Sequence, residues 1–224
     1  MDEQLLSQRL ATIQSQVHEQ GAELIAVTKF VDSQTTRLLY EMGQYHLAEN
    51  RSDKFLAKLE DLADIKDQIT WHFIGHLQSR QVKLIINQID YLHSLDRMSL
   101  AKEIQKRADH PIQCFLQVNV SGEASKGGFA PDQVDEAVRN LKDYDKIRLV
   151  GLMTMAPIDA NEADLHHYFQ TLKNLQVRIA ERGLAYAPCS ELSMGMTRDY
   201  PIALSEGATF VRLGRALFNQ EQPH

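Results

Sequence analysis

The stretch ELIAVTKF, residues 23–30, is a short apolar run that ends on a lysine and a phenylalanine. An aliphatic run of this length, bounded by polar residues, is typical of a strand that is buried on both faces. It follows a segment from Glu3 to Gln20 whose apolar residues recur at helical spacing and which stops at Gly21. The sequence therefore predicts a leading helix followed by a buried strand.

The same strand pattern recurs along the chain, because short apolar runs alternate with longer amphipathic segments. The further predicted strands are YHLAEN (45–50), WHFIGH (71–76), YLHSLD (91–96), QCFLQVNV (113–120), LVGLMTM (149–155), SELSM (190–194) and FVRLG (210–214). Apolar spacing predicts helices over residues 53–65, 79–89, 99–108, 131–141 and 165–182. This alternation predicts an α/β fold, a (β/α)8 TIM barrel with an extra N-terminal helix. The alternative is an open doubly wound sheet, which no GxGxxG or P-loop motif supports.

Composition places the chain among ordinary globular proteins. Its 224 residues are 43% hydrophobic and 24% charged, no linker rich in Pro, Gly or Ser divides them, and we expect a single domain over residues 1–224. The acidic start MDEQLLSQRL does not resemble a signal peptide, which predicts a cytoplasmic protein. A net charge of −6 without a dense Lys/Arg block favours a small-molecule ligand over nucleic acid or a membrane.

The cysteines and the histidines of WHFIGH do not form a metal-binding pattern. Cys114 and Cys189 lie in or beside predicted strands without a CxxC motif or a Cys/His spacing, so we expect buried, reduced thiols. His72 and His76 are four residues apart, and on a strand that spacing gives no tetrahedral site by itself. We therefore expect no metal.

In a barrel of this type function belongs at the carboxyl ends of the strands, and in this chain those ends are polar. The residues at or near them are Lys29, Asn50, His76, Asp96, Asn119, Thr154, Ser193 and Arg212. Alternation along the first strand puts Lys29 on the same face as Ile25 and Val27, where we expect its amine to be partly desolvated. Desolvation disfavours the ammonium form, and a neutral lysine amine forms Schiff bases with aldehydes and ketones. The alternative is an ordinary solvated lysine at a strand end.

Two small-residue turns follow the predicted seventh and eighth strands. In SMGMTRD, Ser193 and Gly195 precede a helix that begins near Asp199 or Tyr200, and in RLGRALF, Gly214 precedes another short helix. Backbone N–H groups in such turns bind anions, and the loops after strands seven and eight of these barrels frequently hold a phosphate. The two turns together predict a phosphate site.

A Schiff-base lysine across the barrel mouth from a phosphate site suggests pyridoxal 5′-phosphate (PLP), whose aldehyde and phosphate need those two groups. A Schiff-base aldolase acting on phosphorylated ketoses uses the same pair of groups. Alternation turns Arg212 inward with Phe210 and Gly214, where its charge can face the pyridine nitrogen of PLP. The alternative for Arg212 is an ion pair with an acidic side chain.

At these residues the chain resembles a known family, the pyridoxal phosphate homeostasis proteins. The resemblance covers almost the whole length through AVTKF, AENRSDKF, WHFIGHLQSRQVK, LHSLDR, QVNVSGEASKGGF, GLMTMAP, LSMGMTRDY and EGATFVRLGRALF, in that order. It implies the barrel of the fold-type III PLP proteins, related to the N-terminal domain of alanine racemase, with PLP held as an internal aldimine. So many motifs at matching separations make the resemblance specific.

Carried over residue by residue, the resemblance assigns the aldimine to Lys29 and a place beside the cofactor to Asn50. It assigns the phosphate and its turns to Ser193, Gly195 and Gly214, and the pyridine nitrogen to Arg212.

Two positions depart from the family pattern. Ala48 stands where a glycine is usual in a GEN motif, and Arg215 stands where a serine or threonine usually adds a hydroxyl to the phosphate. The backbone N–H of Arg215 survives this change, while its guanidinium either reaches the phosphate or points to solvent. Arg215 is therefore kept among the expected cofactor contacts.

The sequence favours a non-enzymatic role over the strongest alternative, a PLP-dependent amino-acid racemase. A lysine aldimine with an arginine at the pyridine nitrogen resembles the arrangement in racemases of this fold. Such an arginine keeps its proton, leaves the pyridine nitrogen unprotonated and weakens the electron sink, which limits the site to modest reactions. Racemases of this fold also take a second base from an added β domain and a partner subunit, whereas only NQEQPH follows Phe218 here. We therefore expect a monomer that binds PLP, limits the free aldehyde and supplies PLP to PLP-dependent apoenzymes.

Overall fold

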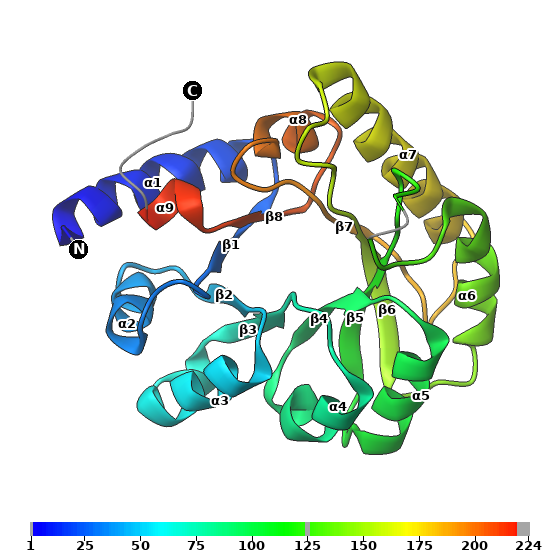
Figure 1. The fold of residues 1–224 in the computed structure, drawn as a ribbon, viewed down its shortest axis with the longest axis horizontal. Coiled ribbons are helices and arrows are strands. Elements are labelled where there is room, and N and C mark those ends of the chain that lie inside the picture. Colours follow the sequence, from blue (N-terminus) through cyan, green and yellow to red (C-terminus); the bar gives the residue numbers. More distant parts are fainter. Residues whose placement is uncertain (1, 124–125, 219–224) are drawn as a thin grey trace.

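Eight parallel strands close into a barrel in the computed structural model, which describes residues 2–123 and 126–218. The strands are β1 (Glu23–Val27), β2 (His46–Glu49), β3 (Thr70–Phe73), β4 (Tyr91–Leu95), β5 (Ile112–Gln117), β6 (Ile147–Met153), β7 (Glu191–Ser193) and β8 (Phe210–Leu213). β1 pairs with β8 as well as with β2, so the sheet closes on itself (Figure 1). The predicted (β/α)8 barrel is confirmed, and the open doubly wound alternative is wrong.

Helices surround the strands (Figure 1). They are α1 (Glu3–Glu19), α2 (Ser33–Glu41), α3 (Ser52–Asp61), α4 (Ser79–Ile85), α5 (Met98–Arg107), α6 (Val134–Asn140), α7 (Glu162–Ala180), α8 (Tyr200–Ser205) and α9 (Arg215–Phe218). Two predicted helices, 79–89 and 131–141, each divide into an α-helix and a single 3-10 turn.

The sequence analysis did not predict α2. Only Thr36 and Leu39 of this helix are buried. Two residues, one of them polar, do not give the repeated apolar spacing by which a helix is recognised in a sequence. Its first turn is capped instead by Asp32, whose carboxylate accepts a hydrogen bond from the Thr35 N–H at 2.8 Å. The capping residue is therefore the sequence signal for α2.

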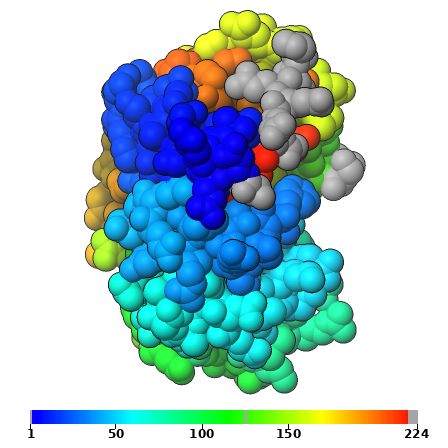
Figure 2. Space-filling model, turned by 90° about the vertical axis from the view of Figure 1, so that its left-hand side faces the viewer, coloured from blue at the N-terminus to red at the C-terminus, as the bar shows by residue number. Residues whose placement is uncertain are grey.

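The N-terminal helix α1 packs beside the point where the barrel closes. Its buried face repeats at three- and four-residue spacing through Leu6, Leu10, Ile13 and Val17 and lies against β1 and α9. Figure 2 shows α1 in blue next to the orange and red segments from the other end of the sequence. The Tyr200 hydroxyl donates to Gln16 Oε1 at 3.0 Å, so α8 is also tied to α1.

The hydrophobic core has two parts, one inside the barrel and one between strands and helices. Ile25 and Val27 belong to the inner part, together with Ala48, Phe115, Val150, Met153 and Phe210. Leu24 and Ala26 belong to the outer part, which includes the buried faces of the helices. The predicted alternation along the first strand is therefore confirmed as far as Val27, where β1 ends.

Cys114 and Cys189 are buried and free, as predicted. Burial raises the pKa of both thiols, to about 12 for Cys189. Both cysteines are therefore protonated at neutral pH. Within the described part of the chain, no helix combines the length and the apolar character needed to cross a membrane.

Gly151 in β6 is required by the close approach of β7. A Cβ at this position would lie 2.1 Å from the carbonyl oxygen of Glu191, with which Gly151 is paired in the sheet. We predict that Gly151→Ala lowers the free energy of unfolding by an amount at the upper end of the roughly 1–3 kcal/mol that overpacking costs. Urea denaturation measures the change. Gly127→Ala is the control, because its Cβ would meet Asp96 at an ordinary 3.5 Å; equal losses in both variants would contradict the prediction.

Candidate functional site

Lys29 lies two residues beyond the end of β1, in a turn at the carboxyl end of the barrel. Its side chain is exposed. Its Nζ lies 4.8 Å from the ring centroid of Phe30, which is itself 70% exposed. The expected partial desolvation of the amine is therefore wrong for this structure, and the amine is accessible from solvent.

Arg212 in β8 is buried inside the barrel, as the alternation predicts. Its Nη1 donates to the hydroxyl of Ser193, and its Nη2 donates to the Thr154 carbonyl oxygen at 3.0 Å. These hydrogen-bond partners are neutral, so the alternative of an ion pair with an acid is wrong for the described chain. Burial lowers the pKa of Arg212 to about 10, and the charge of Asp199 opposes that shift. The guanidinium therefore keeps its proton at neutral pH.

The turns after β7 and β8 bring backbone close to neighbouring elements. Gly195 has a φ of +97°, a left-handed conformation that favours glycine, and a Cβ there would lie 2.7 Å from Ala203 Cβ. A Cβ at Gly214 would lie 3.1 Å from the carbonyl oxygen of Val27. The turn after β8 therefore touches the end of the strand that leads to Lys29.

Two further predicted contacts, Asn50 and Arg215, also lie at the carboxyl end. Asn50 directly follows β2 and is half-buried, and a Cβ at Gly75 would lie 1.9 Å from its carbonyl oxygen. Arg215 begins α9 and is exposed. The fold thus brings Lys29, Asn50, Ser193, Gly195, Arg212, Gly214 and Arg215 to one end of the barrel, while what each of them binds stays a prediction.

A buried ion pair that the sequence analysis missed joins the ends of β1 and β2. Lys58 in α3 contacts Glu49 and donates to the Thr28 carbonyl oxygen at 2.6 Å, and Thr28 Oγ1 donates to the same Glu49 oxygen at 2.6 Å. The other Glu49 oxygen has no hydrogen-bond partner within the described residues. Thr28 and Glu49 directly precede Lys29 and Asn50, so this pair fixes the backbone beneath both. A lysine on the buried face of α3 is the sequence signal for it.

Three histidines occupy the barrel interior, of which the sequence analysis considered only His72. His46 Nδ1 lies 2.9 Å from His72 Nε2, His72 Nδ1 lies 2.8 Å from His93 Nε2, and His93 Nδ1 lies 2.7 Å from Ser193 Oγ. Burial holds the pKa of His72 and of His93 well below the usual 6.5, so both are neutral. The signal that was available is a histidine on each of three consecutive strands.

His76 belongs to a separate cluster at the mouth. Its Nδ1 lies 2.9 Å from Asp96 Oδ2, and the other oxygen of Asp96 accepts from Arg97 Nη1 at 2.6 Å. His72 and His76 therefore do not face the same site, although they are close in sequence.

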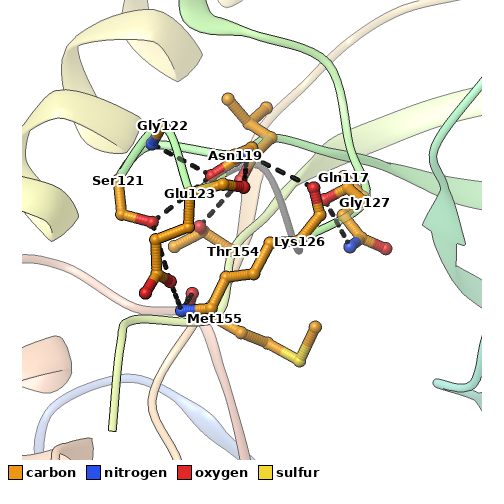
Figure 3. Close-up of polar contacts among 10 residues, drawn as sticks. Gln117, Asn119, Ser121, Gly122, Glu123, Lys126, Gly127, Thr154 and Met155 are labelled. Carbon is orange, nitrogen blue, oxygen red and sulfur yellow. Dashed lines mark hydrogen bonds and ion pairs between the residues drawn. The ribbon is translucent and has the colours of Figure 1, made fainter. Parts of the chain in front are cut away.

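The described residues on the two sides of the gap at 124–125, after β5, are joined by polar contacts of their own side chains (Figure 3). Asn119 Nδ2 donates to the carbonyl oxygens of Glu123 and Lys126, at 2.9 and 3.3 Å. Lys126 forms an ion pair with Glu123 at 2.6 Å and donates to the Met155 carbonyl oxygen at 3.4 Å. The ammonium of Lys126 is thus held by groups around the mouth.

Comparison with known proteins places this barrel in a family. The family described as alanine racemase, N-terminal domain, matches residues 1–222. A pyridoxal phosphate homeostasis protein of Aquifex aeolicus is 38% identical over 207 residues, covering 91% of this chain and 89% of that protein. The chain belongs to the pyridoxal phosphate homeostasis protein family.

Solved structures resemble this member of the pyridoxal phosphate homeostasis protein family over nearly its whole length. PipY of Synechococcus elongatus without PLP is 31% identical, with a TM-score of 0.90 over 96% of this chain and 100% of PipY. PipY with PLP bound gives a TM-score of 0.87 over the same shares. Alanine racemase of Corynebacterium glutamicum is 12% identical, with a TM-score of 0.77 over 98% of this chain and 62% of the racemase, and shares the fold alone.

The buried pair Glu49–Lys58 predicts a large stability effect. We expect Lys58→Met to lower the free energy of unfolding by about 3–5 kcal/mol, because it leaves the Glu49 carboxylate buried without its partner. The double variant Lys58→Met/Glu49→Gln should recover much of that loss, since no buried charge is then stranded. Arg51→Met, which breaks the exposed pair with Asp53, is the control and should leave stability unchanged within error. If denaturant unfolding shows that Arg51→Met lowers the free energy of unfolding as much as Lys58→Met does, this interpretation is contradicted.

Proposed function

We propose that this protein binds PLP at the carboxyl end of its barrel and serves in intracellular PLP homeostasis. The observation that carries the proposal is the contact between the Gly214 turn and the end of β1, which puts the buried Arg212–Ser193 pair beside the strand that leads to Lys29. PLP has three groups to be bound: its aldehyde needs an amine, its pyridine nitrogen needs a fixed polar partner, and its phosphate needs an anion-binding turn. The residues present fit all three. The structure of PipY with PLP bound supports the proposal.

Each residue of the site then has a role that its environment suits. Lys29 holds the aldehyde covalently, since its exposed amine can be reached by a ligand at the mouth, although this structure does not give it the desolvated environment expected from the sequence. Arg212 faces the pyridine nitrogen as a fixed positive charge, since two of its nitrogens are held by Ser193 and Thr154. Bound PLP supplies an electron-withdrawing ring.

The phosphate is assigned to the two glycine turns. Ser193, Gly195 and Gly214 line the expected phosphate site, and Arg215 adds at least its backbone N–H. Asn50 lies beside the cofactor ring. A side chain at Gly195 would meet Ala203 Cβ at 2.7 Å and one at Gly214 would meet the Val27 carbonyl oxygen at 3.1 Å, so packing against the rest of the barrel keeps both turns free of side chains.

We further propose that the protein is a carrier that supplies PLP to apoenzymes, without racemase activity. Its relatives are named homeostasis proteins. The exposure of Lys29 also favours this role, because an amine open to solvent can be reached by water and by an acceptor protein. The guanidinium of Arg212 keeps its proton at neutral pH and does not protonate the pyridine nitrogen, which disfavours carbanion chemistry.

The assignment of Lys29 is tested by trapping. Purified protein mixed with PLP should turn yellow, and borohydride reduction followed by peptide mapping should find the label on Lys29. Lys29→Ala should lose the covalent label, whereas Lys83→Ala, which removes an exposed lysine on α4, should keep it. A label on another lysine of the wild-type protein would refute the assignment. Trapping of a phosphorylated ketose without any bound PLP would favour the aldolase instead.

The carrier role is tested by optical rotation across a panel of L- and D-amino acids with the PLP-loaded protein. We expect turnover no faster than that of free PLP, because the site offers the ring without a proton on its nitrogen. Racemisation at a typical enzyme turnover of about 1–10³ per second, abolished in Lys29→Ala, would overturn the carrier proposal.

The cytoplasmic location and the monomeric state expected from the sequence stay predictions, as does the single domain over residues 1–224.

A further inference from the structure

A line of polar side chains crosses the interior of the barrel. It runs from His46, the first residue of β2, through His72 in β3 and His93 in β4 to Ser193, the last residue of β7. The three distances along it are 2.9, 2.8 and 2.7 Å. His46 stands at the amino end of its strand and Ser193 at the carboxyl end, so the line connects the two faces of the barrel.

The two central rings are held in place by aromatic neighbours. His72 stacks on Tyr91 with the ring centroids 4.6 Å apart and the planes 8° apart, and His93 stacks on Phe115 at 4.3 Å and 17°. Both histidines are at most 1% exposed. Barrel interiors are usually filled by branched aliphatic side chains, and a buried polar line is costly unless every member is satisfied. Its presence here indicates a role beyond packing.

The hydrogen bonds of this line must all point the same way. A neutral imidazole has one N–H donor and one bare nitrogen that accepts, so the direction of one bond dictates the next. Arg212 can only donate to Ser193 Oγ, because a guanidinium has no acceptor. The direction of all the hydrogen bonds in the line therefore depends on whether the hydroxyl hydrogen of Ser193 points to His93. If Ser193 donates to His93, all three histidines carry their proton on Nε2. If His93 donates to Ser193, all three carry it on Nδ1.

We propose that His46, His72 and His93 form a proton relay that changes tautomer as a unit when an anion binds at Ser193. This inference rests on the proposed function, in which Ser193 contacts the phosphate of PLP. The contact between Ser193 Oγ and His93 Nδ1 fits either direction. We take Ser193 as the donor without PLP, because His93 Nδ1 is the acceptor that the described residues offer its hydroxyl, and this choice gives the Nε2–H tautomer in all three rings. A phosphate oxygen at Ser193 accepts the hydrogen bond of that hydroxyl, so that His93 Nδ1 has to donate to Ser193 Oγ and all three rings carry their proton on Nδ1.

The switch leaves the charge of the line unchanged. Ser193 passes its hydroxyl proton to His93 Nδ1 and takes up a proton from a water molecule that accompanies the anion to this fully buried hydroxyl. The hydroxide left behind is balanced by the proton released at the other end of the line. His93 and then His72 each pass the Nε2 proton to Nδ1 of the next ring, and His46 releases its Nε2 proton to solvent. Every residue ends with the number of protons it had at the start. His46 is only half-buried, which gives the line its exit at the face opposite the mouth.

Nitrogen NMR of the full chain labelled with ¹⁵N-histidine tests the relay, because imidazole ¹⁵N shifts distinguish N–H from a bare ring nitrogen. We expect Nε2–H in His46, His72 and His93 without PLP, and Nδ1–H in all three once PLP is bound. Mixed tautomers in the unliganded protein, or a PLP-induced change confined to His93, would overturn the proposal.

His72→Phe interrupts the line and keeps an aromatic ring against Tyr91. In this variant PLP should still change the tautomer of His93 and no longer that of His46. The matched control is His167→Phe on the exposed face of α7. In this control the tautomers of His93 and His46 should still change together when PLP binds. A His46 response that survives in His72→Phe would refute transmission along the line, and the wild-type spectra decide the proposal alone if the variant does not fold.

The yellow absorbance of the same samples separates the two levels of inference. PLP that binds without moving the tautomers refutes the relay and leaves the proposed function intact. Failure of PLP to bind refutes both.

Discussion

The pairing of β1 with β8 is the interaction on which the candidate site depends. It sets Ile25 beside Arg212 and Ala26 beside Leu213, residues that come from opposite ends of the chain. Because the ladder is closed there, the turn at Gly214 reaches the carbonyl oxygen of Val27, and the lysine just past β1 lies on the same rim as the turns after β7 and β8. The helix α1, which packs on β1 and α9, covers this seam from outside. No single segment of the chain contains the site.

The barrel interior combines packing with a small set of fixed hydrogen bonds. Arg212 is a buried charge, and two of its five N–H donors bond a hydroxyl and a backbone carbonyl oxygen, which offsets part of the cost of burying it. The neighbouring histidines are neutral, so they add polarity to the interior without adding a second positive charge. Beneath the mouth, the pair Glu49–Lys58 holds the ends of β1 and β2 together. This pair therefore fixes the backbone that leads to the exposed Lys29.

The sequence predicted the fold and the inward position of Arg212 well, because both follow from periodicity that buried parallel strands share. It was less successful at strand ends. The amine of Lys29 is predicted to be partly desolvated, but Lys29 lies in an exposed turn two residues beyond β1, and apolar spacing does not show where a strand ends. Helix α2 has its sequence signal in the capping residue Asp32 and not in its apolar spacing.

Side-chain networks were harder to predict because their members are distant in sequence. The pairing of Glu49 with Lys58 and the line from His46 to Ser193 depend on which inward positions face one another across a closed barrel. The register between strands and the stagger of the barrel decide which positions face one another, and the sequence of a single strand determines neither of them. The sequence shows a histidine in each of three consecutive strands, but it does not show which side chains these histidines contact.

The central claim is that one PLP molecule lies between Lys29 and the turns after β7 and β8. A crystal structure of the PLP-loaded protein tests it most directly. The account predicts electron density continuous with Lys29 Nζ, a phosphate at the turns of Gly195 and Gly214, and the pyridine nitrogen facing Arg212. Cofactor density that is joined to another lysine, or a phosphate on another side of the barrel, would contradict it.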